Sequence, residues 1–212
     1  MVSVTEFQCL VHEYVDHFPQ LVFPRPETCP HCHASNVFIA HGFYPRKPLS
    51  STQVYRVRIK RWLCKACRHT LSLLPSFLLR FRHYLLEVIQ HVILTRFEEG
   101  ASWTQVVRRC SIEGAPSPRT IYRWCVSFTA HAPVWWAAVQ EPLAHHDASS
   151  PLLDPLGANA GPHDAPCALL QAALHLLAWA KTQWLEVARY GFADRLRFLW
   201  HWGAGQGLGR LI

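Results

Sequence analysis

Residues 56–67, RVRIKRWLCKAC, alternate basic and apolar side chains and then close on a Cys-x-x-Cys pair. Because successive side chains of a β-strand point to opposite faces of a sheet, this alternation predicts a strand with one packed face and one basic face. The packed face would carry Tyr55, Val57 and Ile59, and the open face Arg56, Arg58 and Lys60. The stretch therefore predicts a positively charged strand that ends at two thiols.

A second Cys-x-x-Cys pair, CPHC at residues 29–32, precedes this one in the chain. With a spacing of two residues, a tight turn aims both thiolates at one ion, and two such turns complete a closed tetrahedral site. We predict one structural Zn²⁺ bound by Cys29, Cys32, Cys64 and Cys67. The alternatives are incidental buried cysteines, a redox pair, and replacement of one thiol by a neighbouring histidine: His31, His33 or His69.

The 31 residues between the two cysteine pairs have the composition of strands. Segments 36–44 and 51–63 are rich in β-branched and aromatic residues, and glycine and proline residues mark the break between them. A third short strand is expected at 69–74. Together these segments predict a small three-stranded antiparallel zinc ribbon, whose core is too small to be stable without metal-coupled folding.

Positive charge is concentrated in the same region. The chain carries a net charge of +7, and the interval between Glu27 and Glu87 contains ten Lys and Arg residues and no Asp or Glu. Such a surface attracts an anionic partner. The ribbon residues that we expect to contact DNA are Arg56, Arg58, Lys60, Arg61, Lys65 and Arg68. The alternative is an ordinary solvated strand face.

After Pro75 the apolar residues recur at helical spacing. Residues 76–100 predict a helix of about five turns with Gly100 at its end. Its apolar stripe would consist of Phe81, Leu85, Val88, Ile89 and Val92. Ser102 is expected to cap a second helix, and Ser117 followed by Pro118 to start a third. We therefore predict a trihelical helix-turn-helix domain.

The third predicted helix has two faces of different character. Its apolar back would contain Ile121, Trp124, Cys125 and Phe128, which recur at i, i+3, i+4 and i+7. The residues that we expect to contact DNA from its open side are Ser117, Arg119, Thr120, Tyr122 and Arg123. Arginine donates bidentately to guanine or phosphate, and the hydroxyl groups bond to backbone or base. An ordinary helical bundle with solvated arginines is the alternative.

The strings GASWTQVVRRC at 100–110 and SPRTIYRW at 117–124 resemble the Gly-x-Ser…Ser-x-x-Thr-hydrophobic-x-Arg-Trp pattern of transposase-type helix-turn-helix domains. With CPHC, RIKRWLCKAC and TLSLLPSFL before them, residues 27–131 resemble the zinc-ribbon plus helix-turn-helix module of bacterial insertion-sequence transposases and their accessory proteins. The resemblance implies binding to transposon-end or target DNA. Full transposases usually follow this module with a ribonuclease-H-like domain whose carboxylates hold two metal ions.

The region after His131 departs from that pattern. It contains only six acidic residues and few segments with a strand pattern. We therefore expect no nuclease domain and no enzymatic activity. The Ser-His-Asp order, the phosphate-cradling glycine-rich loop and the close carboxylate pair that mark other enzyme classes are also not found in the sequence.

The expected fold class is α+β and mostly α. We predict five segments: an N-terminal amphipathic helix and linker (1–26), the zinc ribbon (27–75), the helix-turn-helix domain (76–134), a Pro/Ala-rich linker (135–166), and C-terminal helices with a tail (167–212). The Gly-rich end is expected to be exposed or to dock elsewhere.

These features predict a zinc-stabilised, sequence-specific double-stranded DNA-binding protein that serves transposition as an accessory, targeting or regulatory factor. The alternative is a protein-interaction adaptor in a transposition complex or another nucleic-acid assembly. The expected partners are double-stranded DNA and other transposition proteins, with a homodimer left open and no membrane association. Because no signal peptide is visible, we expect a cytoplasmic, nucleoid-associated bacterial protein.

Overall fold

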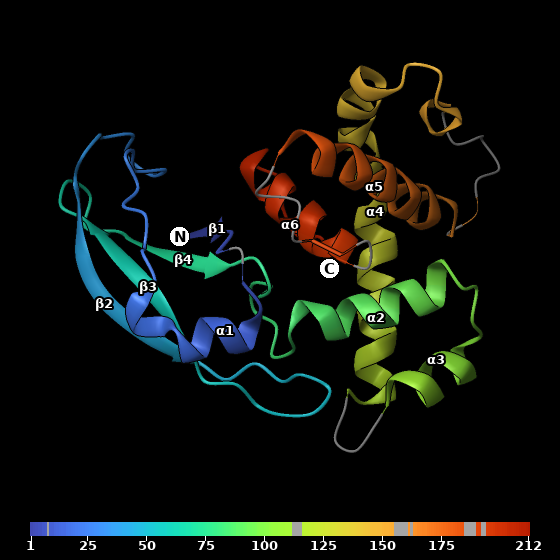
Figure 1. Ribbon diagram of the computed structural model, residues 1–212, viewed down its shortest axis with the longest axis horizontal. Coiled ribbons are helices and arrows are strands. Elements are labelled where there is room, and N and C mark those ends of the chain that lie inside the picture. Colours follow the sequence, from blue (N-terminus) through green and yellow to red (C-terminus); the bar gives the residue numbers. More distant parts are fainter. Residues whose placement is uncertain (8, 112–115, 155–160, 162, 185–189, 192–193) are drawn as a thin grey trace. The chain divides into compact units, whose positions relative to one another are not determined.

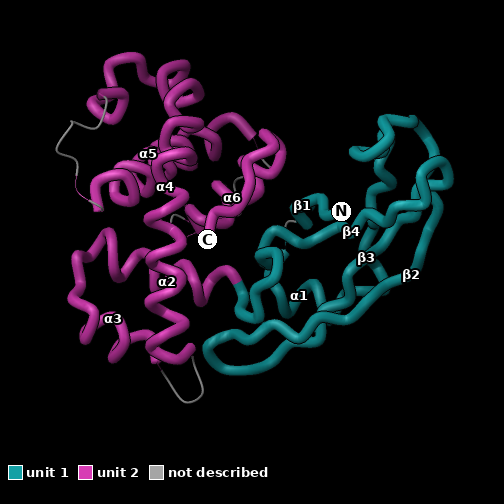
Figure 2. Tube along the Cα trace, turned by 180° about the vertical axis from the view of Figure 1, so that it is seen from behind, with its two compact units in different colours: residues 1–85 teal, residues 86–212 magenta. Residues whose placement is uncertain are grey.

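The computed structural model describes residues 1–212 except 8, 112–115, 155–160, 162, 185–189 and 192–193, which are drawn in grey in Figure 1. The chain forms two units, residues 1–85 and residues 86–212, which Figure 2 shows in different colours. Each unit has its own buried apolar residues. No described helix combines the length and the hydropathy needed to cross a membrane.

Unit 1 is built on a four-stranded mixed sheet in the order β1-β4-β3-β2. Its strands are β1 (Val2–Thr5), β2 (Phe38–Arg46), β3 (Val57–Cys64) and β4 (Thr70–Pro75). β3 pairs antiparallel with both β2 and β4, whereas β1 runs parallel to β4. Figure 1 shows these strands side by side, with the short helix α1 (Val11–Asp16) and the 3₁₀ turn η1 (Phe18–Gln20) contributed by the chain between β1 and β2.

The prediction of a three-stranded antiparallel ribbon is wrong, because the N-terminal segment adds a fourth, parallel strand. Val2 pairs with Ser72 and Thr5 pairs with Pro75, so β1 occupies the edge of β4. All of β4 after Thr70 is buried. Backbone N–H and C=O groups left without a hydrogen bond at such a buried edge would cost free energy. The pairing with β1 gives those of β4 their partners. A first strand of four residues is too short to give a reliable alternation signal, which is why the sequence indicated only a helix here.

The predicted strand alternation is confirmed within β3. Val57 and Ile59 are fully buried, whereas Arg58 is exposed. β3 begins at Val57 rather than at residue 51, so Tyr55 and Arg56 precede it. β2 contains a bulge between Ala40 and Phe43, where the register to β3 shifts.

Unit 2 contains five α-helices within its described residues, where three were predicted for the helix-turn-helix domain. They are α2 (Leu86–Phe97), α3 (Trp103–Cys110), α4 (Pro118–His146), α5 (Asp164–Gln183) and α6 (Arg195–Gly205), with a 3₁₀ turn η2 (Pro151–Leu153) between α4 and α5. α4 is 29 residues long and contacts α2 and α5, and α6 contacts α2 and α5. The prediction of a separate trihelical helix-turn-helix domain is therefore wrong, since α5 packs against α4 and α6 against α2 within the same compact unit.

The first predicted helix begins ten residues later than expected. Residues 76–85 belong to unit 1, and α2 starts at Leu86. Phe81 was predicted on the apolar stripe of this helix, but its side chain is 78% exposed and its backbone has a φ of 59°. The apolar residues that precede it, Phe77, Leu78 and Leu79, are buried in unit 1 directly after β4, and their spacing resembles that of an apolar helix face.

The predicted starts of the next two helices are confirmed. The Ser102 hydroxyl accepts the N–H of Gln105, whose side chain in turn accepts the N–H of Ser102, which is a complete capping box. Ser117 caps α4 by accepting the N–H of Thr120, and Pro118 follows as the first helical residue. The predicted apolar face of α4 is also confirmed, because Ile121, Trp124, Cys125 and Phe128 are buried.

In the C-terminal part, one segment differs from expectation and another takes one of its two expected states. Residues 135–146, assigned to a Pro/Ala-rich linker, form the second half of α4 and bury Trp135, Val139 and Leu143. The glycine-rich end, expected either to be exposed or to dock, packs into unit 2, where Leu211 and Ile212 are buried. The indole N–H of Trp135 donates to the carbonyl of Arg210 at 2.9 Å. The two prolines inside α4, Pro133 and Pro142, lie where the helix continues although each lacks a backbone N–H.

Candidate metal centre and nucleic-acid interface

Two turns of unit 1 bring the four predicted cysteine ligands together. Cys29 and Cys32 lie in the turn before β2, and Cys64 and Cys67 lie where β3 ends and turns toward β4. The Sγ atoms are 3.7 Å apart for Cys29 and Cys67 and 3.7 Å apart for Cys32 and Cys64, and all four lie within 4.8 Å of one another. A tetrahedron with metal–sulfur bonds of about 2.3 Å has sulfur–sulfur edges of about 3.8 Å, so the four thiols could hold one metal ion.

The two turns have the same backbone hydrogen bonds. The N–H of His33 donates to the carbonyl of Cys29 at 2.8 Å, and the N–H of Arg68 donates to the carbonyl of Cys64 at 2.9 Å. His33 and Arg68 have left-handed φ values of 58° and 61°. The first cysteine of each pair donates its own N–H five residues ahead, Cys29 to Ala34 and Cys64 to His69. Backbone bonding thus orients both thiol pairs toward the same point.

An apolar cluster surrounds the thiols. Cys29 and Cys64 are buried together with Phe38 and Leu71, and the partly buried residues packed against them are Val37, Trp62 and Cys67. Cys32 is exposed. The candidate metal centre is therefore covered by apolar side chains at Cys29 and Cys64 and exposed to solvent at Cys32.

The thiols perturb one another's ionisation. Burial tends to raise the pKa of Cys29, but backbone hydrogen bonds from Cys32 and His31 and side-chain bonds from Cys64 and Cys32 lower it to about 6. For Cys67, a backbone hydrogen bond from His69 lowers the pKa, while burial and the neighbouring thiols raise it to about 12. Four adjacent thiolates are compatible only with a cation among them, because like charges at this distance oppose further ionisation.

The neighbouring histidines are not needed to complete the ligand set, because four thiols already converge. The rings of His31 and His69 stack with a centroid distance of 3.7 Å on the exposed side of the turns. With Cys67 they form a second group of potential ligands. His33 is exposed.

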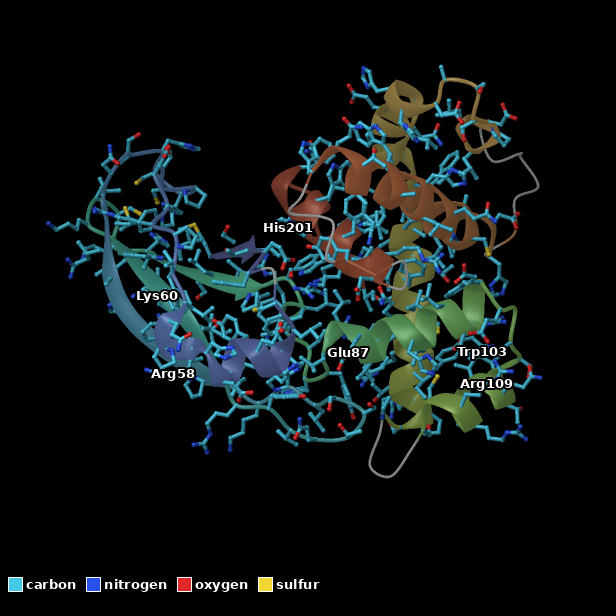
Figure 3. All side chains as sticks on the ribbon, in the orientation of Figure 1. Arg58, Lys60, Glu87, Trp103, Arg109 and His201 are labelled. Carbon is cyan, nitrogen blue, oxygen red and sulfur yellow. The ribbon has the colours of Figure 1, made fainter. Side chains whose placement is uncertain are left out.

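Two of the predicted DNA-contacting residues lie in a row of cations and aromatic rings on β3. The guanidinium of Arg58 lies 4.6 Å from the ring of Phe18 and 5.0 Å from the ring of Phe43. The ammonium of Lys60 lies 4.6 Å from Phe43 and 4.7 Å from Trp62. Figure 3 labels both basic residues along β3. We call these five residues the β3 row. Because Trp62 also packs against the thiol cluster, the row ends at the candidate metal centre.

The other predicted basic residues of unit 1 are distributed around the row. Arg61 points to the opposite face of β3, where it lies 5.8 Å from the ring of Tyr44 and donates to the Thr70 hydroxyl at 3.2 Å. The remaining three are exposed: Arg56 before β3, and Lys65 and Arg68 in the second cysteine turn.

The predicted contacts of unit 2 gather at the first turns of α4. Arg119, Tyr122 and Arg123 are exposed, and Thr120 is half-buried. The hydroxyl groups of Ser117 and Thr120 lie 3.0 Å apart and serve the helix cap, so Ser117 has a structural role already. The open side of these turns therefore presents two arginines and one tyrosine.

An aromatic residue that sequence reasoning missed lies beside this surface. The ring of Trp103, at the start of α3, lies 5.1 Å from the ring of Tyr122, and the guanidinium of Arg96 lies 4.8 Å from Trp103. Trp103 is 38% exposed. Figure 3 labels it on α3. The signal available in the sequence was a tryptophan at the first, solvent-facing position after the Ser102 cap.

Comparison with protein families gives one match. Residues 29–124 match the model of a domain of unknown function, DUF6431. The matched range begins at the first cysteine of the candidate metal centre and ends in the first turns of α4. No curated protein and no solved structure matches the chain.

Proposed function

We propose that this protein is a sequence-specific double-stranded DNA-binding protein whose unit 1 is stabilised by one structural Zn²⁺. The observation that carries the proposal is the β3 row, in which cations and aromatic rings alternate beside a four-thiol centre. No acidic residue lies between Glu27 and Glu87, and the nearest acidic residues of a neighbouring element are Glu13 and Asp16 of α1, which contacts β3. An unbalanced basic surface is the electrostatic footprint of a nucleic-acid-binding protein.

The donor set supports zinc as the metal. Four thiolates at tetrahedral spacing are typical of zinc or iron–sulfur sites, and a closed set of four protein ligands leaves no position for substrate. The four cysteines would bind the ion, and the backbone hydrogen bonds of the two turns would hold the thiols in position. When bound, the ion links the end of β3 to the turn before β2. The proposal includes no catalytic activity.

DNA would be recognised by two kinds of contact. Arg58 and Lys60 of the β3 row, together with Lys65 and Arg68, would bind phosphates. Arg119 and Arg123 of α4 would reach base edges, since arginine donates bidentately to guanine. The resemblance of the sequence to transposase modules suggests the setting, a transposon-associated accessory, targeting or regulatory role at the bacterial nucleoid.

Selection of bound sequences from a random duplex pool tests the proposal, with zinc-loaded and with chelated protein. We expect one motif to be enriched by the zinc-loaded protein only. For the enriched duplex, Arg58→Gln and Lys60→Gln should each reduce the slope of log affinity against log salt by about one. Arg119→Ala and Arg123→Ala should each cost about 1–3 kcal/mol and relax sequence preference.

A matched control is Arg210→Gln, which removes an exposed positive charge from unit 2 outside the proposed surface. This variant should keep both the affinity and the sequence preference. Failure of the zinc-loaded protein to bind any duplex in low salt would refute the proposal. Equal losses on every sequence for the α4 variants would leave those arginines as phosphate contacts only.

A second candidate function, a protein-interaction adaptor, is favoured by one feature of α4. Tyr122, Val126 and Val134 are 53%, 47% and 63% exposed, and with the exposed Ala130 they recur every four residues along one side of the helix. Val126→Lys with Val134→Lys would abolish capture of a protein partner that persists after nuclease treatment. Unchanged capture by this double variant would exclude the stripe as the contact.

A further inference from the structure

A pocket on unit 1 carries an unusual concentration of positive charge. Its volume is about 660 Å³, within the range of small-ligand sites. The basic residues that line it are Arg46, Lys47, Arg80, Arg82 and His83, and none of the lining residues is acidic. The end of β2 and the segment after β4 supply these side chains. The composition therefore fits an anionic ligand.

The pocket also presents an exposed aromatic ring in a strained turn. Phe81 lines the pocket, is 78% exposed and has a left-handed φ of 59°. A bulky residue in this conformation costs free energy and persists only where its surroundings hold it. The guanidinium of Arg80 lies 5.5 Å from its ring. An apolar ring kept in solvent at a conformational cost is available for stacking.

Arg46 holds this turn on both sides of Phe81. Its Nη1 donates to the carbonyl of Leu79 at 3.1 Å, and its Nη2 donates to the carbonyl of Arg82. Arg46 is itself partly buried. It is thus a positioning residue that fixes the segment from which Arg80 and Phe81 project, and its charge adds to the positive potential of the pocket.

The pocket and the β3 row lie on opposite faces of the sheet. Phe43 of the row pairs with Lys60, whereas the pocket residues Tyr44 and Arg46 pair with the buried Ile59 and Val57 on the other face; of the pocket residues on β2, Pro45 pairs with Arg58. Adjacent residues of a strand point to opposite faces. The pocket is therefore a separate surface that duplex binding through the β3 row does not use.

We propose that this pocket binds one nucleotide unit of single-stranded DNA, with its base stacked on Phe81 and its phosphate bound by Lys47 and Arg80. A phosphate alone would explain the cations but not the exposed ring, and a base stacks readily on an aromatic side chain. In a duplex the faces of a base are covered by its neighbours, so an unpaired nucleotide is the matching ligand. The inference goes beyond the proposed duplex recognition and uses different residues.

The test measures binding of the zinc-loaded full chain to a labelled ten-residue thymidine oligonucleotide by fluorescence anisotropy. Phe81→Gly relieves the backbone strain and removes the ring, and we expect it to weaken oligonucleotide binding at least fivefold. Affinity for the selected duplex should change less than twofold. Phe81→Trp keeps an aromatic ring and should retain binding, and Val22→Ala, at an apolar residue of unit 1 that is 85% exposed and does not line the pocket, is the matched control.

The phosphate contacts have their own readout. Lys47→Gln and Arg80→Gln should each reduce the salt slope of oligonucleotide binding by about 0.7, the value expected for one single-strand phosphate contact. Equal affinity of wild type and Phe81→Gly for the oligonucleotide would overturn the inference, while the duplex proposal would stand. Thymidine 5′-monophosphate is the comparison ligand. If it binds as tightly as the oligonucleotide, the pocket serves a free nucleotide and the single-strand assignment is wrong.

Discussion

Tyr14 joins α1 to the sheet of unit 1 through one buried hydrogen bond. Its side chain is fully buried, and its hydroxyl donates to the carbonyl of Arg58 at 2.9 Å. Replacement by phenylalanine keeps the ring contacts with Phe7 and Phe77 but leaves the carbonyl without this donor. We expect Tyr14→Phe to lower the free energy of unfolding of unit 1 by about 0.5–1.5 kcal/mol at pH 7, measured by urea denaturation.

The same residue gives a pH-dependent prediction. Burial, with a smaller contribution from Cys9, raises the pKa of Tyr14 well above its ordinary value, and Arg58 only partly opposes this. The folded protein therefore keeps the phenol neutral at a pH where the unfolded chain ionises, so this contribution to stability is present below pH 10 and is lost above it. Wild type should lose about 1.4 kcal/mol more than Tyr14→Phe between pH 9 and pH 11. Parallel losses in the two proteins would contradict the assignment.

At the scale of single residues, the sequence predicted what depends on local spacing. The thiols were predictable because a Cys-x-x-Cys turn aims both side chains at one point, whatever the rest of the fold does. The stacking of Arg58 and Lys60 on aromatic rings was not, because Phe18 is 40 residues away from Arg58 in the chain and reaches it only through α1 and η1. The cations were therefore recognised, while the rings that hold them were missed.

At the scale of elements, strands with clear alternation and helices with caps were predictable, whereas edges and long-range packing were not. The alternation of basic and apolar residues predicted β3, and the capping residues Ser102 and Ser117 predicted the starts of α3 and α4. β1 was missed because its pairing to β4 joins residues that are 70 positions apart, such as Val2 and Ser72. α2 was predicted to start too early because the apolar residues between Phe77 and Leu85 are spaced by chance as on a helix face, although Arg80 and Phe81 are exposed in a turn.

The contact between α6 and α4 gives a test at this scale. A Cβ atom added to Gly203 would lie 2.2 Å from Cζ3 of Trp135, so the helices approach closely only with glycine at this position. Gly203→Ala should destabilise unit 2 by about 1–3 kcal/mol, because the ring or the helix must shift. The matched control is Gly205→Ala in the same helix, where a Cβ would meet nothing within 4 Å.

Thermal and urea unfolding of the two variants provides the measurement. The Gly205→Ala protein should be as stable as wild type or slightly more stable, since alanine favours the helix. If both substitutions have the same effect, the close approach of α6 to Trp135 is not a determinant of stability.

At the scale of the whole molecule, the two units are expected to respond differently to metal removal. The four thiols join the turn before β2 to the end of β3 and the turn that follows it. All of these segments lie within residues 1–85. Zinc-coupled folding supplies about 10–16 kcal/mol in small zinc domains. Unit 2 has a core of its own, in which Arg195 of α6 bonds with Glu98 at 2.8 Å and the Gln90 side chain accepts the N–H of Leu196.

We therefore expect chelation, or Cys64→Ser, to expose residues 1–85 to hydrogen exchange while α2 to α6 remain protected. Mass spectrometry of exchanged peptides separates the two units directly. A cysteine outside the centre provides a control: Cys110→Ser, on α3, should leave exchange in unit 1 unchanged. Loss of protection in both units at once, or in neither, would be inconsistent with a metal centre that stabilises unit 1 alone.

The separation of the two cysteine turns has a consequence for biosynthesis. At about 5–20 residues per second, Cys64 leaves the ribosome about two to seven seconds after Cys29. During this interval Cys29 and Cys32 are an oxidisable pair on a nascent chain, and only translation of β3 and the turn after it delivers the two thiols that would complete the proposed site. If these thiols hold the proposed ion, we expect the yield of native protein to depend on the supply of metal and reductant during synthesis.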